Sequence, residues 1–132
     1  MCWTSYIKPI RFIAHEDIKC YTVFNKTNIV WNNSKIKEII SLYRNYLYIP
    51  YNINPEINIV YPNYLIDFIY DEYSYCIQEG YHSYSTFNIA KLYSNNFFPI
   101  IECSIPKGSE YYVNEDHEIV SSNIIVTDKI VK

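Results

Sequence analysis

The sequence predicts an α+β fold in a single domain over residues 1–132, built around a mostly antiparallel sheet with two or three short helices. A length of 132 residues is typical of one domain. Hydrophobic residues make up 49% of the chain and charged residues 19%, which is enough apolar material for a packed core and argues against disorder. Strand-like alternation at both ends, with helical spacing between them, predicts the order of the elements.

The N-terminal part is typical of a strand that enters a hairpin. Residues 17–24 alternate in the manner of a strand, with Ile18 and Cys20 on one face and Tyr21 on the other. A polar break follows them. Residues 29–31 are then expected to return as the second arm of the hairpin.

The middle of the chain favours helix and strand in turn. Apolar residues at helical spacing predict a helix over residues 35–47, and Ser34 is suited to cap its start. The next stretch, residues 56–79, is ambiguous. Pro62 could occupy the first turn of a third helix that runs through Tyr70, and Tyr73–Ile77 after it is more typical of a strand.

The C-terminal half begins with a short helix and continues with strands. Ser85 or Thr86 can cap a helix over residues 87–94. The two asparagines that follow end it. Alternating apolar residues then predict four strands, at residues 98–105, 111–113, 118–121 and 124–131.

Charge and hydropathy exclude several classes of partner. The net charge of −3 and the lack of any Lys/Arg run argue against binding to a nucleic acid polymer. No stretch reaches 18 apolar residues, so no membrane span is expected. The N-terminus lacks the pattern of a secretory signal, so the expected location is the cytoplasm. The 23 isoleucines and 16 tyrosines fit an A/T-rich genome.

The cysteines and glycines give no sign of a cofactor. Cys2, Cys20, Cys76 and Cys103 are expected to be free thiols in a reducing compartment. They form no Cys-x-x-Cys pair and have no paired histidines near them, so no metal site is predicted. The two glycines stand alone and cannot build a phosphate-binding loop.

The most distinctive candidate site is the turn before the second helix. His82 could act there as an acid or base near neutral pH, or it could be a structural hydrogen-bonding residue. A second candidate is the acidic turn that ends at Glu118, which would bind a ribose hydroxyl or a cation, or would simply be a solvated hairpin. No nucleophile stands in a Gly-x-Ser-x-Gly context. The residues therefore predict a binding protein rather than an enzyme, and no catalytic residue is assigned.

Four segments resemble small uncharacterised proteins of phages and mobile elements in A/T-rich gut bacteria. They are IKCYTV (18–23), GYHSY (80–84), ECSIPKGSEYY (102–112) and IVSSNIIV (119–126). This resemblance implies an accessory, counter-defence type of protein in the host cytoplasm. We expect it to sequester a host-derived small molecule, such as a nucleotide signal.

The chain is also similar to the ADP-ribosyltransferase-like fold. That fold carries an Arg, His or Tyr on its first core strand, a Ser or Tyr on the second and a Glu near the last. Tyr21, Ser83 and Glu118 occur here in that order. The chain departs from the pattern because it has no Ser-Thr-Ser run and no Arg on the first strand, and because Asp116 stands two residues before the Glu.

Three hypotheses of function follow. In the first, a nucleotide-like ligand stacks on Tyr81 or Tyr84 and makes polar contacts with His82 and Ser83. In the second, an enzyme of ADP-ribosyl transfer or nucleotide cleavage uses Glu118 to stabilise a ribose cation, with Tyr21 and His82 orienting the ligand. In the third, the protein acts by its surface alone, as an interaction or virion component. We also expect a homo-oligomer, formed through the strand at residues 124–131.

Overall fold

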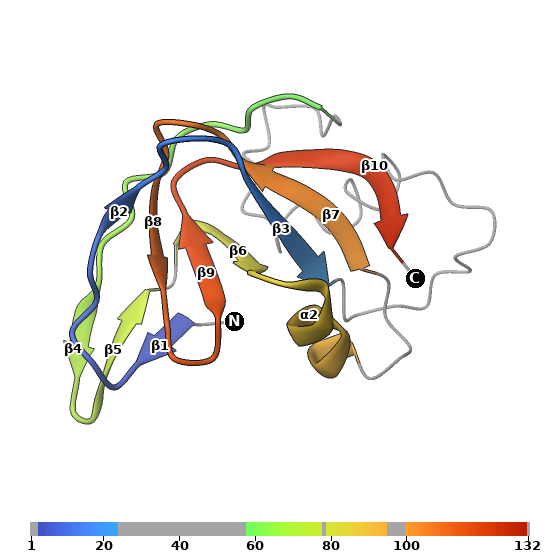
Figure 1. Cartoon of the computed structure of the whole chain (residues 1–132). Coiled ribbons are helices and arrows are strands. Elements are labelled where there is room, and N and C mark those ends of the chain that lie inside the picture. The colour runs from blue at the N-terminus through green and yellow to red at the C-terminus, as the bar shows by residue number, and fades with distance from the viewer. Residues whose placement is uncertain (1–2, 24–57, 78, 95–99, 132) are drawn as a thin grey trace.

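The computed structural model describes residues 3–23, 58–77, 79–94 and 100–131, which form ten strands and one helix (Figure 1). The elements are β1 (Trp3–Ser5), β2 (Phe12–Ile13), β3 (Ile18–Val23), β4 (Ile69–Asp71), β5 (Ser74–Ile77), β6 (Tyr81–Tyr84), α2 (Phe87–Ser94), β7 (Ile100–Ile105), β8 (Glu110–Val113), β9 (Glu118–Ser121) and β10 (Ile125–Val131).

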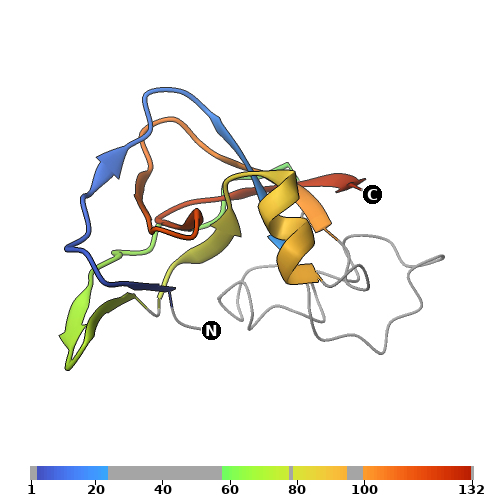
Figure 2. The ribbon, with the colours of Figure 1, turned by 60° about the horizontal axis from the view of Figure 1, so that its bottom comes forward.

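Seven of the strands form one antiparallel sheet in the order β10-β7-β3-β6-β9-β8-β2. Strands β3, β6 and β9 therefore lie side by side in its middle. Strands β1, β5 and β4 form a second, smaller antiparallel sheet at one end of the molecule (Figures 1 and 2). The expected mostly antiparallel sheet is confirmed.

One face of the seven-stranded sheet, the core face, carries the largest cluster of buried residues. Cys20, Ile101, Cys103 and Ile119 belong to this cluster and are at most 3% exposed. Cys20 and Cys103 are directly opposite each other on neighbouring strands. The cluster forms because alternate residues of each strand point to the same side of the sheet.

The opposite face, the helix face, is covered by two other elements. Helix α2 packs there through Ala90, which joins a cluster with Tyr84 of β6. The smaller sheet contributes Trp3 and Ile77, which pack with Val120 of β9. The central strands are therefore covered on the helix face by a helix at one side and by a sheet at the other.

Several predicted elements are confirmed. The helix expected over residues 87–94 is α2, and the strands expected in the C-terminal half correspond to β7, β8, β9 and β10. The strand expected over residues 73–77 is β5. The helix expected over residues 35–47 and the hairpin arm at residues 29–31 lie outside the described residues.

The prediction that a third helix could run from Pro62 through Tyr70 is wrong. The backbone of this segment pairs instead with the chain that follows β9: Tyr61 N–H donates to the Ile124 carbonyl at 2.9 Å, and Tyr64 N–H to that of Ser122 at 2.8 Å. These bonds give the segment partners that a helix would have to supply internally. The described residues thus contain one helix rather than two or three. That helix does not have the length and apolar character needed to cross a membrane.

The cysteines follow the expectation only in part. Cys20 and Cys103 are free and buried. Burial raises the pKa of the Cys103 thiol to about 12 and that of Cys20 well above its usual value. Cys76 on β5, in contrast, is disulfide-bonded, which contradicts the expectation of free thiols throughout.

Candidate functional site

Three of the predicted site residues form a row across the central strands. Tyr21 of β3 is directly opposite Tyr84 of β6, and Tyr84 is directly opposite Glu118 of β9. Directly opposite residues of antiparallel strands point to the same face of the sheet. The structure therefore brings Tyr21, Tyr84 and Glu118 together on the helix face, and we call them the central row.

The other three predicted residues divide between the two faces. His82 is two residues from Tyr84 on the same strand, so its half-buried side chain is on the helix face. Tyr81 and Ser83 point to the core face and are at most 3% exposed. The Tyr81 hydroxyl donates to the carbonyl of Pro62 at 2.8 Å. Tyr81 and Ser83 are thus core residues here and lie on the opposite face of the sheet from the row.

The Ser83 hydroxyl has an unusual environment in the core. Its oxygen is buried and has no hydrogen-bond partner of ordinary geometry in the described part of the chain. It nevertheless lies close enough to Cys20 to oppose the rise in pKa that burial causes in that thiol. Since Ser83 contacts Cys20 in the interior, a ligand on the helix face would not meet its side chain.

Helix α2 supplies two aromatic rings to the central row. The Tyr93 ring stacks on Tyr84, with centroids 4.8 Å apart and planes at 14°. The Phe87 ring meets Tyr21 edge-on at 6.2 Å. Sequence reasoning did not include these two residues. The available signal was that each lies three residues from Ala90 in the expected helix 87–94, one on either flank of the side that packs against the strands.

Glu118 stands at the end of a tight turn that Asn114 organises. The Asn114 Oδ1 atom accepts the backbone N–H groups of Asp116 at 3.0 Å and Glu118 at 2.9 Å. His117, between them, adopts a left-handed conformation with φ of 59°. The Glu118 backbone is held from a third side, because Trp3 Nε1 donates to its carbonyl at 2.8 Å. These bonds fix the position of Glu118 at the start of β9.

The electrostatics of Glu118 are unusual for a glutamate beside a surface turn. Its side chain is half-buried, and this burial, with a smaller effect from the negative charge of Asp116, raises its pKa, while a hydrogen bond with Asn114 opposes the rise. Burial and the charges of Glu118 and Asp116 also raise the pKa of Tyr93. Tyr93 is therefore protonated at neutral pH and has a hydroxyl hydrogen to donate beside two carboxylates.

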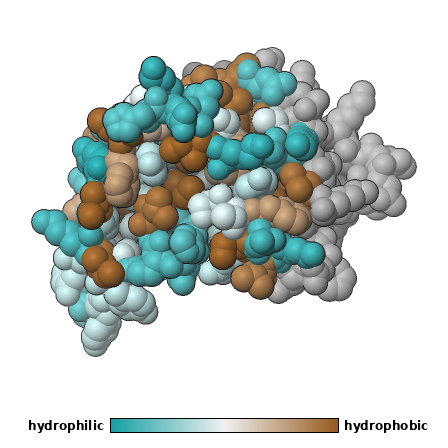
Figure 3. Space-filling view, viewed as in Figure 1, coloured by the Kyte–Doolittle hydropathy of each residue, from teal (hydrophilic) through white to brown (hydrophobic). Residues whose placement is uncertain are grey.

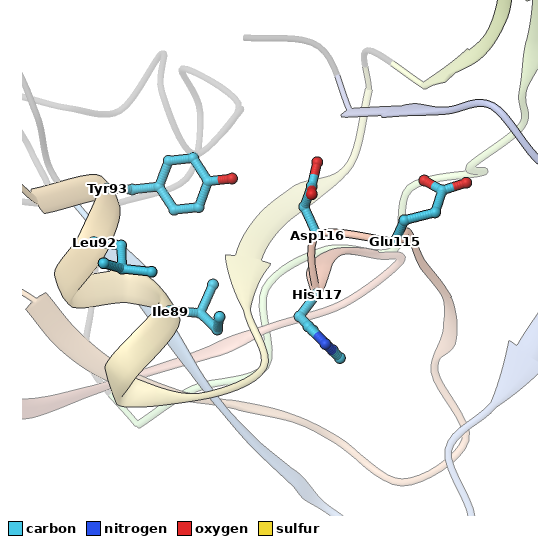
Figure 4. A pocket seen from close by; sticks show the side chains of 6 residues that line it. All are labelled: Ile89, Leu92, Tyr93, Glu115, Asp116 and His117. Atoms are coloured by element: carbon cyan, nitrogen blue, oxygen red, sulfur yellow. The ribbon is translucent and has the colours of Figure 1, made fainter.

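A cavity of about 360 Å³ adjoins the row between α2 and the turn before β9 (Figure 4). Tyr93 points across it toward Asp116. Glu115 turns away, since its Oε1 accepts the Ser5 hydroxyl at 2.8 Å and the Ile7 N–H at 3.2 Å. The full lining is Ile89, Leu92, Tyr93, Glu115, Asp116 and His117. One wall is thus apolar and aromatic, and the other is acidic.

No residue of the central row lines the cavity, but two of the lining residues are close to the row. Tyr93 stacks on Tyr84, and Asp116 is two residues before Glu118. The volume falls within the range of small-molecule sites, about 300–1,000 Å³. A ligand in this cavity would contact Tyr93 and Asp116, which lie between it and the row in sequence and in stacking.

A second carboxylate extends the row on its other side. Glu102 of β7 is directly opposite Tyr21, so its side chain is also on the helix face. Its carboxylate lies 3.3 Å from the Lys19 ammonium and 3.8 Å from that of Lys129. Glu102 is thus neutralised by two lysines, whereas Glu118 lies beside another acid.

The described residues contain no group of three His, Cys, Asp or Glu side chains placed to hold a metal ion. Comparison with known proteins found no match: no family model, no curated protein and no solved structure is significantly similar to this chain.

Proposed function

We propose that this protein binds a nucleotide-like small molecule of the ADP-ribose class at the central row and its adjoining cavity. The observation that supports this most is the register of β3, β6 and β9, which aligns Tyr21, Tyr84 and Glu118 on one face. These are the residue types that the similarity to the ADP-ribosyltransferase-like fold implies for three successive positions. On the second strand the matching residue is Tyr84 rather than Ser83.

The chemistry of the site defines which part of such a ligand would lie where. The Glu118 carboxylate can accept hydrogen bonds from ribose hydroxyls. The Tyr93 ring, which is 43% exposed, offers an aromatic surface for a flat heterocycle. The charges of Asp116 and Glu118 repel phosphate, so the phosphate groups would extend away from the turn. The end of the ligand near Glu118 is therefore a sugar or a cationic ring.

A second candidate function is transfer or hydrolysis of the ADP-ribosyl group, and the position of Glu118 favours it. When the bond between ribose and nicotinamide breaks in NAD, positive charge develops on the ribose. A fixed carboxylate beside that carbon would stabilise the charge. The Glu118 N–H donates to Asn114 Oδ1 and its carbonyl accepts from Trp3 Nε1, so the backbone that carries this carboxylate is held in place.

Ligand binding is tested by thermal unfolding with ADP-ribose, NAD and cyclic nucleotides. A ligand at one hundred times its Kd stabilises the protein by about 2.7 kcal/mol, which is a shift of several degrees. We expect Glu118→Gln to remove most of this shift and Glu110→Gln to keep it. Glu110 is a suitable control because it is half-buried on β8, away from the row, where it pairs with Arg11. Absence of a shift across the panel, or equal loss in both variants, would contradict the proposal.

Binding and catalysis are separated by the fate of the ligand. If the protein sequesters its ligand, mass spectrometry of the denatured protein recovers that molecule intact, and NAD incubated with the protein is unchanged. If the protein is a transferase or hydrolase, nicotinamide is released from NAD and Glu118→Gln abolishes the release. For the counter-defence role, expression in bacteria should lower the free level of the bound signal nucleotide, and Glu118→Gln should restore it.

A further inference from the structure

The exposed apolar side chains gather in two segments of the chain. Of the twelve large hydrophobic residues that are exposed in the described part of the chain, nine lie in residues 6–13 and 65–73. Their exposed fractions run from 43% for Phe12 to 82% for Tyr6 and Tyr73. We call these two segments together the β2–β4 surface.

The two segments are at the same end of the molecule. Strands β2 and β4 appear on the same side in both ribbon views (Figures 1 and 2), and apolar atoms are visible over this side in the space-filling view (Figure 3). Arg11 links the segments directly, because its guanidinium donates to the carbonyl of Ile66 at 3.5 Å. Arg11 therefore joins the two segments at one point.

Each segment also contains the outermost strand of a sheet. Strand β2 is at the end of the seven-stranded sheet, and β4 is at the end of the three-stranded sheet. Every residue of both strands is exposed. Exposed sheet edges are usually protected by charges, prolines or covering segments. Here β2 carries Phe12 and Ile13, and β4 carries Ile69 and Tyr70 with one charge, Asp71; the apolar residues favour contact with another chain.

The charges of the two segments are opposite. Residues 6–13 contain Lys8 and Arg11, of which Arg11 already pairs with Glu110 of its own chain at 3.9 Å, and residues 65–73 contain two aspartates and one glutamate. In a two-fold dimer, a contact from one segment to the other is made twice, once in each direction. A surface that is basic in one half and acidic in the other is therefore complementary to itself.

The exposed apolar area is of the order that an interface needs. Nine large side chains at these exposures present about 1,000 Å² on each copy, of which one partner can cover only part, because consecutive strand residues such as Phe12 and Ile13 point to opposite faces. A standard interface buries about 800 Å² on each partner. We propose that two copies of this chain form a two-fold dimer through the β2–β4 surface, with residues 6–13 of each copy packed against residues 65–73 of the other.

This places the interface away from the strand that the sequence suggested. The outer edge of β10 is occupied near its start, because Asn58 N–H donates to the Val126 carbonyl at 2.8 Å and Tyr61 N–H to that of Ile124 at 2.9 Å. The Ile124 and Val126 side chains are fully buried. Neither of them is available to a second copy.

The test is the mass in solution at about 50 µM, measured by light scattering and by analytical ultracentrifugation. We expect twice the 15.8 kDa of one chain. Leu65→Asp, which puts a charge in the interface at a side chain 79% exposed, should weaken the dimer at least roughly a hundredfold. Leu92→Asp is the matched control, since Leu92 is 72% exposed but lies on α2, and it should leave the mass unchanged.

A charge exchange tests the pairing of the two segments. Lys8→Glu should raise the dissociation constant roughly tenfold, and combining it with Glu72→Lys should recover most of the affinity. Circular dichroism checks that each variant is folded. A mass of 15.8 kDa for the wild type would overturn the proposal. So would a Leu65→Asp variant that remains dimeric, a Leu92→Asp variant that dissociates equally, or an exchange that recovers nothing.

Discussion

Replacing Gly80 by alanine perturbs the packing at the start of β6, four residues before Tyr84 of the central row. Gly80 immediately precedes β6 and has a φ of +118°, which L residues rarely adopt. An added Cβ would be 2.7 Å from Val120 Cγ2 and 2.8 Å from Ile66 Cγ2. Both of those side chains are fully buried, so neither can move into solvent. Gly80→Ala therefore combines backbone strain with overpacking.

The two costs can be estimated separately. A residue held in a rarely populated backbone region costs about 1–3 kcal/mol. Overpacking a closed core costs a further amount of about 1–3 kcal/mol. We expect Gly80→Ala to lower the free energy of unfolding by about 2–6 kcal/mol, a large part of the roughly 5–15 kcal/mol typical of a domain.

Gly108→Ala is the matched control because it has only the backbone cost. Gly108 has a φ of +90°, and no atom lies within 4 Å of the position its Cβ would take. Urea unfolding of the wild type and the two variants gives both free energies, with the slope m expected to be unchanged. We expect Gly80→Ala to be destabilised by at least about 1 kcal/mol more than Gly108→Ala. Equal destabilisation of the two variants would refute the packing argument.

Three further perturbations have defined outcomes. His117→Gly should raise the free energy of unfolding by about 0.5–1 kcal/mol, measured by urea unfolding, because glycine adopts a φ of 59° without strain. Glu118→Gln should be more stable than the wild type at pH 7 in thermal unfolding. Because the pKa of Glu118 is raised in the folded state, the wild type gains stability as pH falls through that value, and the difference between the two proteins should close in acid. Cys20 and Cys103 should resist alkylation at pH 8 until the protein is unfolded, since burial raises both pKa values and blocks access.

Much of the sheet could be predicted from the sequence because its strands have local signatures. Strand β7 alternates so that Ile101, Cys103 and Ile105 share the core face, and this pattern was visible in the sequence. The segment at Pro62–Tyr70 has no such signature. Its backbone partners lie some sixty residues further along the chain, beyond β9, and a proline that suits a helix start also suits an extended segment. Local patterns therefore favoured helix where distant pairing produces an extended chain.

The candidate site shows the same limit at the scale of one residue. Tyr21, His82 and Glu118 were predicted and lie on the helix face, but Ser83 and Tyr84 are adjacent and point to opposite faces. Which of the two lies on the helix face depends on the register of β6 with both of its neighbours, because a shift of one residue reverses every side chain on a strand. That register is determined jointly by the core packing on one face and by helix α2 on the other. The face on which each of these two side chains lies could therefore be known only after the pairing of three strands was known.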